Sequence, residues 1–150
     1  MQRAAIRELI DTWYDAHKHA DLAFFDRILA DDVEWTMHGP PQAFPVPNSL
    51  YGKPAVLDAI ARVHGALYVV RNVQREVMID GDRAAVISDR TVVQRATGRT
   101  MVYRVAAFLR FRDEKLVSYQ SFYDSFDMLE QVIGEHLDVP DTYHKGSHGH

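Results

Sequence analysis

The last third of the chain, from Arg83 to Val132, constrains the fold more than any other part. Three segments with alternating apolar and polar residues are separated by two tight turns, and the third runs directly into a short amphipathic helix. Alternation over more than four residues is typical of strands that bury one face. The region therefore predicts a curved antiparallel meander that ends in a helix, which is the form of a pocket wall.

The first half of the chain predicts helices that can cover this sheet. An apolar stripe at helical spacing indicates a first helix from Gln2 to Ala20, and Asp21 is placed to cap a short second helix. A strand is expected from Asp32 to His38. The segment Lys53–Gly65 has the pattern of a third helix, with proline in its first turn and glycine at its end.

A long strand is expected from Tyr68 to Ile79, closed by the hairpin signal Asp80-Gly81. Ahead of the third helix, Gly39–Tyr51 holds four of the six prolines. Because proline has no backbone donor and a fixed φ, this segment is expected to be a stiff surface loop, placed as a lid. The order of elements predicts an α+β fold with its helices on one face of the sheet.

Composition limits the classes of function. The chain has 150 residues, 47% hydrophobic and 25% charged, which predicts one globular domain at residues 1–135 and a flexible polar tail at 136–150. Its 17 basic residues are spread along the chain and the net charge is -4, which argues against a nucleic-acid partner. No apolar run is long enough to span a membrane, and the first residues are charged, so a soluble cytoplasmic protein is expected. The lack of cysteine excludes disulfides and thiol catalysis.

Four motifs resemble a known superfamily: Asp31–Trp35, Gly52–Val56 at the start of the third helix, Phe111–Val117, and Phe122–Asp124. They look like the nuclear transport factor 2-like superfamily, and within it the SnoaL-like (polyketide cyclase) group, related to limonene epoxide hydrolases and ketosteroid isomerases. The resemblance covers about residues 3–135. It implies a conical barrel of a strongly curved, mostly antiparallel sheet, with helices packed on its concave face around one deep apolar pocket. It also implies a homodimer that packs through the outer face of the sheet.

Strand parity assigns residues to the two faces of this sheet. Similarity to the epoxide hydrolases turns the odd-numbered residues of Val117–Tyr123 toward the pocket. The preceding strand then sends Tyr103 inward and Phe108 outward, and Arg90 is the one strongly polar group on the inner face of its strand. Phe108 and Phe122 on the outer face suit a subunit interface, where aromatic residues are enriched.

The departures from the family restrict the chemistry. Limonene epoxide hydrolases carry Arg-Val-Asp where this chain has Arg90–Val92, and Trp-Arg-Asp where it has Tyr119–Ser121, so both carboxylates are missing. Protonation of an epoxide and activation of water need such a pair, and epoxide hydrolysis is therefore not expected to run as it does in the family. The acids of ketosteroid isomerases align near Trp35 and Ala107, so that chemistry is not expected either.

The remaining candidates for ligand binding lie on the predicted inner face. Three tyrosines on the last two strands can donate hydrogen bonds to a ligand carbonyl. Isomerase-like members place a further tyrosine on the first helix, although a tyrosine on an apolar helix stripe more often belongs to the core. The candidate ligand-binding residues are Tyr14, Trp35, Tyr103, Tyr119, Ser121 and Tyr123.

The candidate catalytic residues are His38, Arg90 and Asp124. Arg90 and the tyrosines would stabilise negative charge on a substrate oxygen, and His38 or Asp124 would move a proton. A solvated histidine is the favoured interpretation of His38, and a helix N-cap that of Asp124. His17 and His19 are two residues apart on a helix and are expected to point to different sides. No metal or cofactor is expected, because no phosphate-binding glycine loop or metal-ligand pattern is present.

These observations leave two hypotheses. The first is a SnoaL-like protein that binds or converts a small hydrophobic, oxygen-bearing molecule such as a polyketide, terpenoid or steroid, by isomerase, cyclase or hydrolase chemistry. The second is a non-catalytic ligand-binding or dimerisation module, favoured by the missing carboxylate pair. A carboxylate or imidazole in the cavity, within reach of Arg90 or a tyrosine, would support the enzyme.

Overall fold

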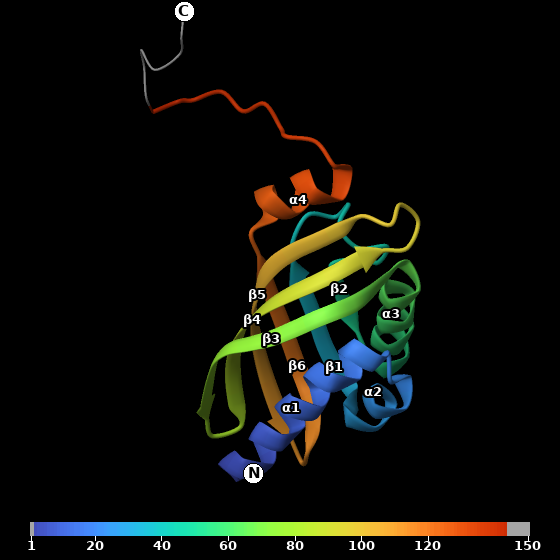
Figure 1. Cartoon of the computed structure of the whole chain (residues 1–150). Coiled ribbons are helices and arrows are strands. Elements are labelled where there is room, and N and C mark those ends of the chain that lie inside the picture. Colours follow the sequence, from blue (N-terminus) through green and yellow to red (C-terminus); the bar gives the residue numbers. More distant parts are fainter. Residues whose placement is uncertain (1, 144–150) are drawn as a thin grey trace, which may run out of the picture.

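The computed structural model describes residues 2–143 of the chain, and Figure 1 shows its elements. Within that part the elements follow in the order α1 (Arg3–His19), α2 (Leu22–Ile28), β1 (Leu29–His38), β2 (Ser49–Tyr51), α3 (Lys53–Ala66), β3 (Leu67–Asp80), β4 (Arg83–Gln94), β5 (Thr100–Arg112), β6 (Lys115–Tyr123) and α4 (Ser125–Ile133). The α+β class and the antiparallel meander β4–β5–β6 are confirmed.

The strands form one six-stranded sheet in the order β2-β1-β6-β5-β4-β3. Neighbouring strands are antiparallel except β1 and β6, which run parallel. The sheet is strongly curved and stays open, with β2 and β3 at its edges. Helix α3 contacts both of these edge strands, so it spans the gap that hydrogen bonds leave open (Figure 1).

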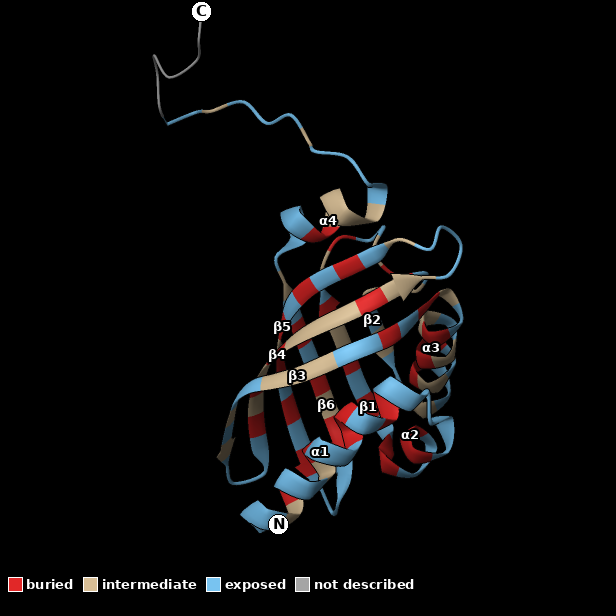
Figure 2. Cartoon of the chain, viewed as in Figure 1, coloured by how far each residue is buried: buried red, intermediate tan, exposed pale blue. Residues whose placement is uncertain are grey.

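Burial alternates along the strands, as Figure 2 shows. On β5, Tyr103, Val105 and Leu109 are buried while Arg104 and Phe108 are exposed, which confirms the predicted parity. The inner residues pack against the apolar stripe of α1, including Ile6, Ile10 and Trp13. The core therefore lies between the concave face of the sheet and the helices that cover it.

Local signals place most element ends as expected. The Asp21 carboxylate accepts a hydrogen bond from the Phe24 amide at 3.2 Å and caps α2. Gly81, at φ +57°, lies in the turn between β3 and β4. Helix α3 continues one residue beyond Gly65.

The proline-rich segment differs from the prediction at its end. Its last three residues form the edge strand β2, in which Leu50 pairs with Trp35 of β1. The prolines all precede Ser49, so the backbone donors of Ser49–Tyr51 are free to pair with a neighbouring strand.

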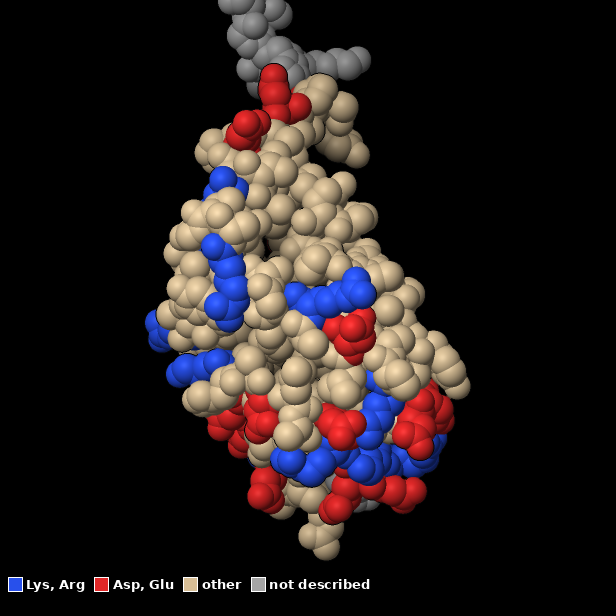
Figure 3. All heavy atoms as spheres, turned by 90° about the vertical axis from the view of Figure 1, so that its right-hand side faces the viewer, with Lys and Arg blue, Asp and Glu red and all other residues tan. Residues whose placement is uncertain are grey.

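Beyond α4 the chain has no helix or strand as far as Tyr143, and residues 144–150 of the predicted tail lie outside the described residues. No helix within residues 2–143 has the length and apolar character that crossing a bilayer requires. Acidic and basic side chains are interspersed at the lower end of the face in Figure 3, and the upper part of that face is mostly uncharged.

Candidate ligand pocket

A cavity of about 40 Å³ lies inside the curve of the sheet, between strands β1, β3–β6 and helices α1 and α3. Most of its wall is apolar. Met37, Phe44, Val46, Ile60 and Val63 contribute to one side, and Phe44 and Val46 come from the proline-rich loop. The polar groups that line it are His17, His64, Arg90, Tyr103, Tyr119 and Tyr123.

Arg90 carries the only guanidinium among the residues that line this pocket. On β4 it lies opposite Tyr103 of β5 and Asn72 of β3. Its Nε atom is buried and has no hydrogen-bond partner among the described residues. Burial acts to lower the pKa of Arg90, but the tyrosines around it raise this pKa, and the net direction is upward. The guanidinium therefore keeps its charge at any physiological pH.

No Asp or Glu within residues 2–143 lines the pocket. Asp89, the neighbour of Arg90 in sequence, points to the outer face, where it forms ion pairs with Arg75 and Arg104 at 2.8 Å each. The positive charge of Arg90 thus faces phenol groups and apolar side chains.

The tyrosines of the pocket are held as protonated donors. Burial raises the pKa of Tyr103, and it raises that of Tyr123 to about 12, although the nearby Arg90 lowers both. Burial likewise raises the pKa of Tyr119 well above its ordinary value. The Ser121 hydroxyl donates to the Tyr123 hydroxyl at 3.0 Å. At neutral pH these phenols can therefore donate hydrogen bonds to a ligand oxygen.

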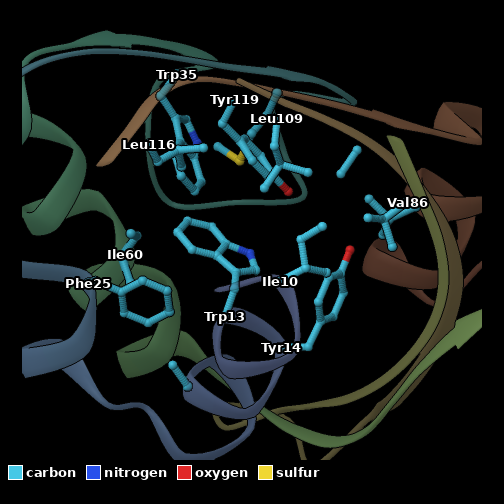
Figure 4. Close-up of a cluster of buried hydrophobic side chains, with 14 of the residues drawn as sticks. Ile10, Trp13, Tyr14, Phe25, Trp35, Ile60, Val86, Leu109, Leu116 and Tyr119 are labelled. Carbon is cyan, nitrogen blue, oxygen red and sulfur yellow. The ribbon is translucent and has the colours of Figure 1, made fainter. Parts of the chain in front are cut away.

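Trp35 and Tyr119 form a flat wall beside them, with ring centroids 4.0 Å apart. Figure 4 shows this pair next to Trp13, while Tyr14 projects from α1 with its hydroxyl toward the sheet. Burial raises the pKa of Tyr14, and Arg90 is close enough to lower it in part. Tyr14 is buried in the core cluster, behind the residues that line the cavity.

Two histidines complete the pocket, and the sequence did not point to either as a site residue. His17 on α1 and His64 on α3 are buried, and His17 Nδ1 lies 3.2 Å from His64 Nε2, at hydrogen-bond distance. Burial, Arg90 and the neighbouring His64 lower the pKa of His17 well below its ordinary value. Burial and Arg90 also lower the pKa of His64. Both imidazoles are therefore neutral at pH 7.

Their positions explain why they were missed. The two histidines are 47 residues apart and meet only because α1 and α3 lie on the same concave face. The one available signal was periodicity, since His17 follows Trp13 and His64 follows Ile60 by four residues, on apolar stripes that face the core.

Two of the candidate catalytic residues lie away from the pocket. His38 is exposed on the outer face, where its ring stacks on Phe122 at 4.4 Å and its Nε2 lies 3.3 Å from Gln120 Oε1. The outer position of His38 agrees with strand parity, because Trp35 and Met37, at the odd-numbered positions of the same strand, point inward. The Asp124 carboxylate accepts a hydrogen bond from the Asp127 amide at 3.1 Å and caps α4. Arg90 and the three strand tyrosines are brought together as expected.

The sequence of the chain also matches a known protein family. The sequence model of the SnoaL-like domain matches residues 10–119. The chain belongs to this family. No curated protein matches the SnoaL-like chain in sequence.

Solved structures show the same nuclear transport factor 2-like fold. A candidate isomerase from Rhodopseudomonas palustris is 24% identical, with a TM-score of 0.80 over 90% of this chain and 100% of its own. An epoxide hydrolase of the limonene epoxide hydrolase-like type from M. tuberculosis is 15% identical, with a TM-score of 0.69 over 87% and 90%. TerC, co-crystallised with polyporic acid, is 20% identical, with a TM-score of 0.72 over 86% and 98%.

The pocket of this SnoaL-like domain departs from epoxide hydrolase chemistry at the positions noted in the sequence. Val92 and Ser121 are fully buried on the inner face, where that chemistry needs carboxylates. The pocket offers a charged guanidinium, three phenols and two neutral imidazoles instead.

Proposed function

We propose that this protein is an acid–base enzyme of the isomerase, cyclase or hydrolase type. Its substrate is a small hydrophobic molecule that bears an oxygen, such as a polyketide, terpenoid or steroid. The observation that carries the proposal is the guanidinium of Arg90, which faces no carboxylate among the described pocket residues and lies among phenol donors in a mostly apolar pocket that also holds a neutral imidazole pair.

Arg90 and the tyrosines would stabilise negative charge that develops on the substrate oxygen. Preorganised donors of this kind act strongly in a site from which water is excluded, because they need no reorganisation during the reaction. The raised tyrosine pKa values keep these groups protonated. The charge on Arg90 favours an enolate over the neutral ketone, and this difference is what lowers a reaction barrier.

The imidazole pair would move the proton. Each neutral imidazole has one N–H and one lone pair, so the His17–His64 hydrogen bond uses one of each. One lone pair and one N–H remain at the outer nitrogens of the pair. The dyad can therefore take a proton at one end and release one at the other, which suits a reaction that removes and returns a proton.

The rival function is a non-catalytic ligand-binding module. The absence of carboxylates among the described pocket residues favours it. A binding module would hold the same ligands without exchanging their protons, so a measurement of proton exchange distinguishes the two functions.

The test uses 2-tetralone, a small bicyclic ketone with exchangeable protons beside its carbonyl. Deuterium uptake from D₂O, followed by NMR, should be faster with the protein than in buffer. His64→Gln should lower the rate by about 10²- to 10⁴-fold, the usual contribution of a general base. Binding without accelerated exchange would contradict the enzyme and support the binding module.

Arg90→Met tests the oxyanion role in the same assay. It replaces a charge with an apolar side chain of similar length, so the fold should be retained. The free energy of ketone binding, or of stabilisation of the exchange transition state, should become less favourable by roughly 1.5–3 kcal/mol, the contribution of a charge-assisted hydrogen bond. Arg71→Met, at an exposed position of β3, is the matched control. An equal loss of ketone binding or exchange in both variants would show that Arg90 has no specific role in the site.

We also propose a homodimer that packs through the outer face of the sheet. Phe108 and Phe122 are 50% and 42% exposed there, and their rings contact each other with centroids 5.8 Å apart. A groove of about 450 Å³ runs beside them, flanked by Arg83 and Arg110. Aromatic residues and arginine are enriched at protein interfaces, which supports this choice of surface.

A further inference from the structure

A row of polar side chains crosses the inner face of the sheet at one end of the pocket. Asn72 of β3 pairs with Arg90 of β4, and Arg90 pairs with Tyr103 of β5. Side chains directly opposite on neighbouring strands have Cβ atoms about 4.5–5.5 Å apart and share a face. Arg90 is therefore flanked by an amide on one side and a phenol on the other.

Two members of this row have buried polar atoms without partners. Asn72 Nδ2, Asn72 Oδ1 and Arg90 Nε make no hydrogen bond with any residue that the structure describes. Buried polar groups in folded proteins almost always have a partner, and those that lack one call for an explanation. Three such atoms side by side, around a permanent charge, indicate a group that binds from outside the chain.

The chemistry of the orphaned atoms specifies that group. Arg90 Nε and Asn72 Nδ2 are donors, and the charge of Arg90 calls for an anion. Asn72 Oδ1 is an acceptor and needs a donor on the ligand. Water can satisfy the amide but cannot neutralise the guanidinium, whereas an anionic oxygen with a hydroxyl beside it meets both needs.

The acid next to Arg90 in sequence and an acid on the covering helix α1 have other partners. Asp89 is paired with Arg75 and Arg104 on the outer face. Asp11 on α1 accepts a hydrogen bond from Gln74 Nε2 at 3.1 Å and forms an ion pair with Arg7. The adjoining pair Gln74 and Ser88 continues the polar strip, and Gln74 Oε1 is also buried without a partner within residues 2–143.

Of this row, Arg90 and Tyr103 line the pocket, and Asn72 lies beside Arg90 by the register of β3 and β4. The proline-rich loop contributes the apolar residues Phe44 and Val46 to the same pocket. We propose that Asn72, Arg90 and Tyr103 form a recognition site for an organic acid with a hydroxyl next to its carboxylate, or for the equivalent enol anion. The acidic head lies at Arg90 and the apolar body points toward Phe44. This inference rests on the proposed function for the location of the site, and it adds the class of substrate.

The test compares three probes that differ at one group: mandelate, phenylacetate and 2-methoxy-2-phenylacetate. NMR titration of the full-length protein gives a dissociation constant for each. Mandelate should bind about tenfold more tightly than the other two, since one added hydrogen bond is typically worth about this factor. Asn72→Leu, a change of similar volume, should remove the preference and leave phenylacetate affinity within about twofold.

Asn72→Asp is the second variant. Unlike Asn72→Leu, it places no apolar side chain beside Arg90, so it tests the site even if the leucine variant does not fold. A carboxylate opposite Arg90 neutralises the guanidinium from within the chain. It should therefore weaken binding of all three acids by more than about tenfold, while retaining the fold. Arg71→Met, at an exposed position of β3, is the control and should leave all three constants unchanged.

Several outcomes overturn the inference. They are equal binding of mandelate and phenylacetate, a preference that survives Asn72→Leu, or no binding of any acid at millimolar concentration. The 2-tetralone exchange assay is independent of these results, because that ketone carries neither a carboxylate nor a hydroxyl. Accelerated exchange without acid binding would leave the proposed function standing and remove the substrate class alone.

Discussion

At the scale of single residues, the charge state of each pocket group follows from its burial and its neighbours. Arg90 stays charged because a guanidinium does not lose its proton in a protein. The phenols stay neutral because burial raises their pKa values, and the imidazoles stay neutral because burial and Arg90 lower theirs. Burial is thus the main cause of the neutral state of these groups, and Arg90 reinforces it for the histidines and opposes it for the tyrosines.

The histidine pair makes stability depend on pH. Its pKa values in the folded protein lie below the unfolded value of 6.5, so the unfolded chain binds more protons as the pH falls below that value. The free energy of unfolding should therefore decrease below about pH 6.5, by up to about 1.4 kcal/mol per pH unit for each histidine that stays neutral. Urea denaturation at pH 7.5, 6.5 and 5.5 measures this slope. His17→Phe should reduce it, and an unchanged slope would contradict neutral burial of His17.

At the scale of elements, the proline-rich loop closes one side of the pocket with Phe44 and Val46. Phe44 of the loop packs on Tyr123 with centroids 5.5 Å apart. Gly39 lies so close to the same ring that an added Cβ would be 3.0 Å from Tyr123 Cδ2. The cavity of about 40 Å³ is far smaller than a pocket for a drug-sized ligand, roughly 300–1,000 Å³. The pocket must therefore enlarge to hold a ligand, and we expect this loop to move.

Phe44→Ala tests the loop as a lid. Loss of the ring should enlarge the cavity and speed both association and dissociation of 2-tetralone, at a stability cost of no more than about 3 kcal/mol. Stopped-flow or NMR exchange kinetics would show the change. Pro41→Ala, at an exposed position of the same loop, is the control. Unchanged rates in Phe44→Ala would mean that the ligand enters by another route.

The side-chain amide of Gln131 on helix α4 pairs with the backbone of β5, and Arg99, just before β5, donates to the Val132 carbonyl of the helix at 2.7 Å. Gln131 accepts a hydrogen bond from the Val102 amide and donates one to the Val102 carbonyl, each at 2.7 Å, where β6 no longer covers the edge of β5. Gln131→Ala leaves both backbone groups without this partner, and should destabilise the docked helix by roughly 1–2 kcal/mol. Amide hydrogen exchange in α4 should rise accordingly. Glu135→Ala, just beyond the helix, is the control, and equal exchange in both variants would contradict the clamp.

At the scale of the whole molecule, the two faces of the curved sheet differ in what they carry. Its concave face holds the pocket and is covered by α1, α2 and α3 (Figure 1). Its convex face carries exposed aromatic rings beside a groove. A face of this kind is typical of a surface that binds a partner.

The dimer predicts a solution mass twice the 17.2 kDa of one chain, measurable by light scattering at micromolar concentration. Phe108→Glu should give monomers, because it places a charge in the centre of the apolar contact. Phe126→Glu is the matched control, since Phe126 is 48% exposed on α4 and away from this face. A monomeric wild type, or dissociation by both variants alike, would rule out this interface.

The sequence by itself determined which residues of the meander share a face. A strand has a period of two residues, so Tyr119 and Tyr123 had to lie on one side of their strand, and the resemblance to the epoxide hydrolases chose that side as the inner one. The same period, applied to the strand of Trp35 and Met37, is consistent with the exposed position that the structure gives His38. The helix caps Asp21 and Asp124 were equally local, because an N-cap needs only backbone amides two or three residues away.

The tertiary structure alone decided which groups share the pocket. His17 and His64 are on different helices, and no local spacing connects them. Asn72 came to lie beside Arg90 through a β3–β4 register that a bulge shifts between Val69 and Arg71. A register shift of one residue turns every following side chain to the other face. Contacts between distant segments depend on such registers and on helix packing, which are properties of the folded chain rather than of any short stretch of sequence.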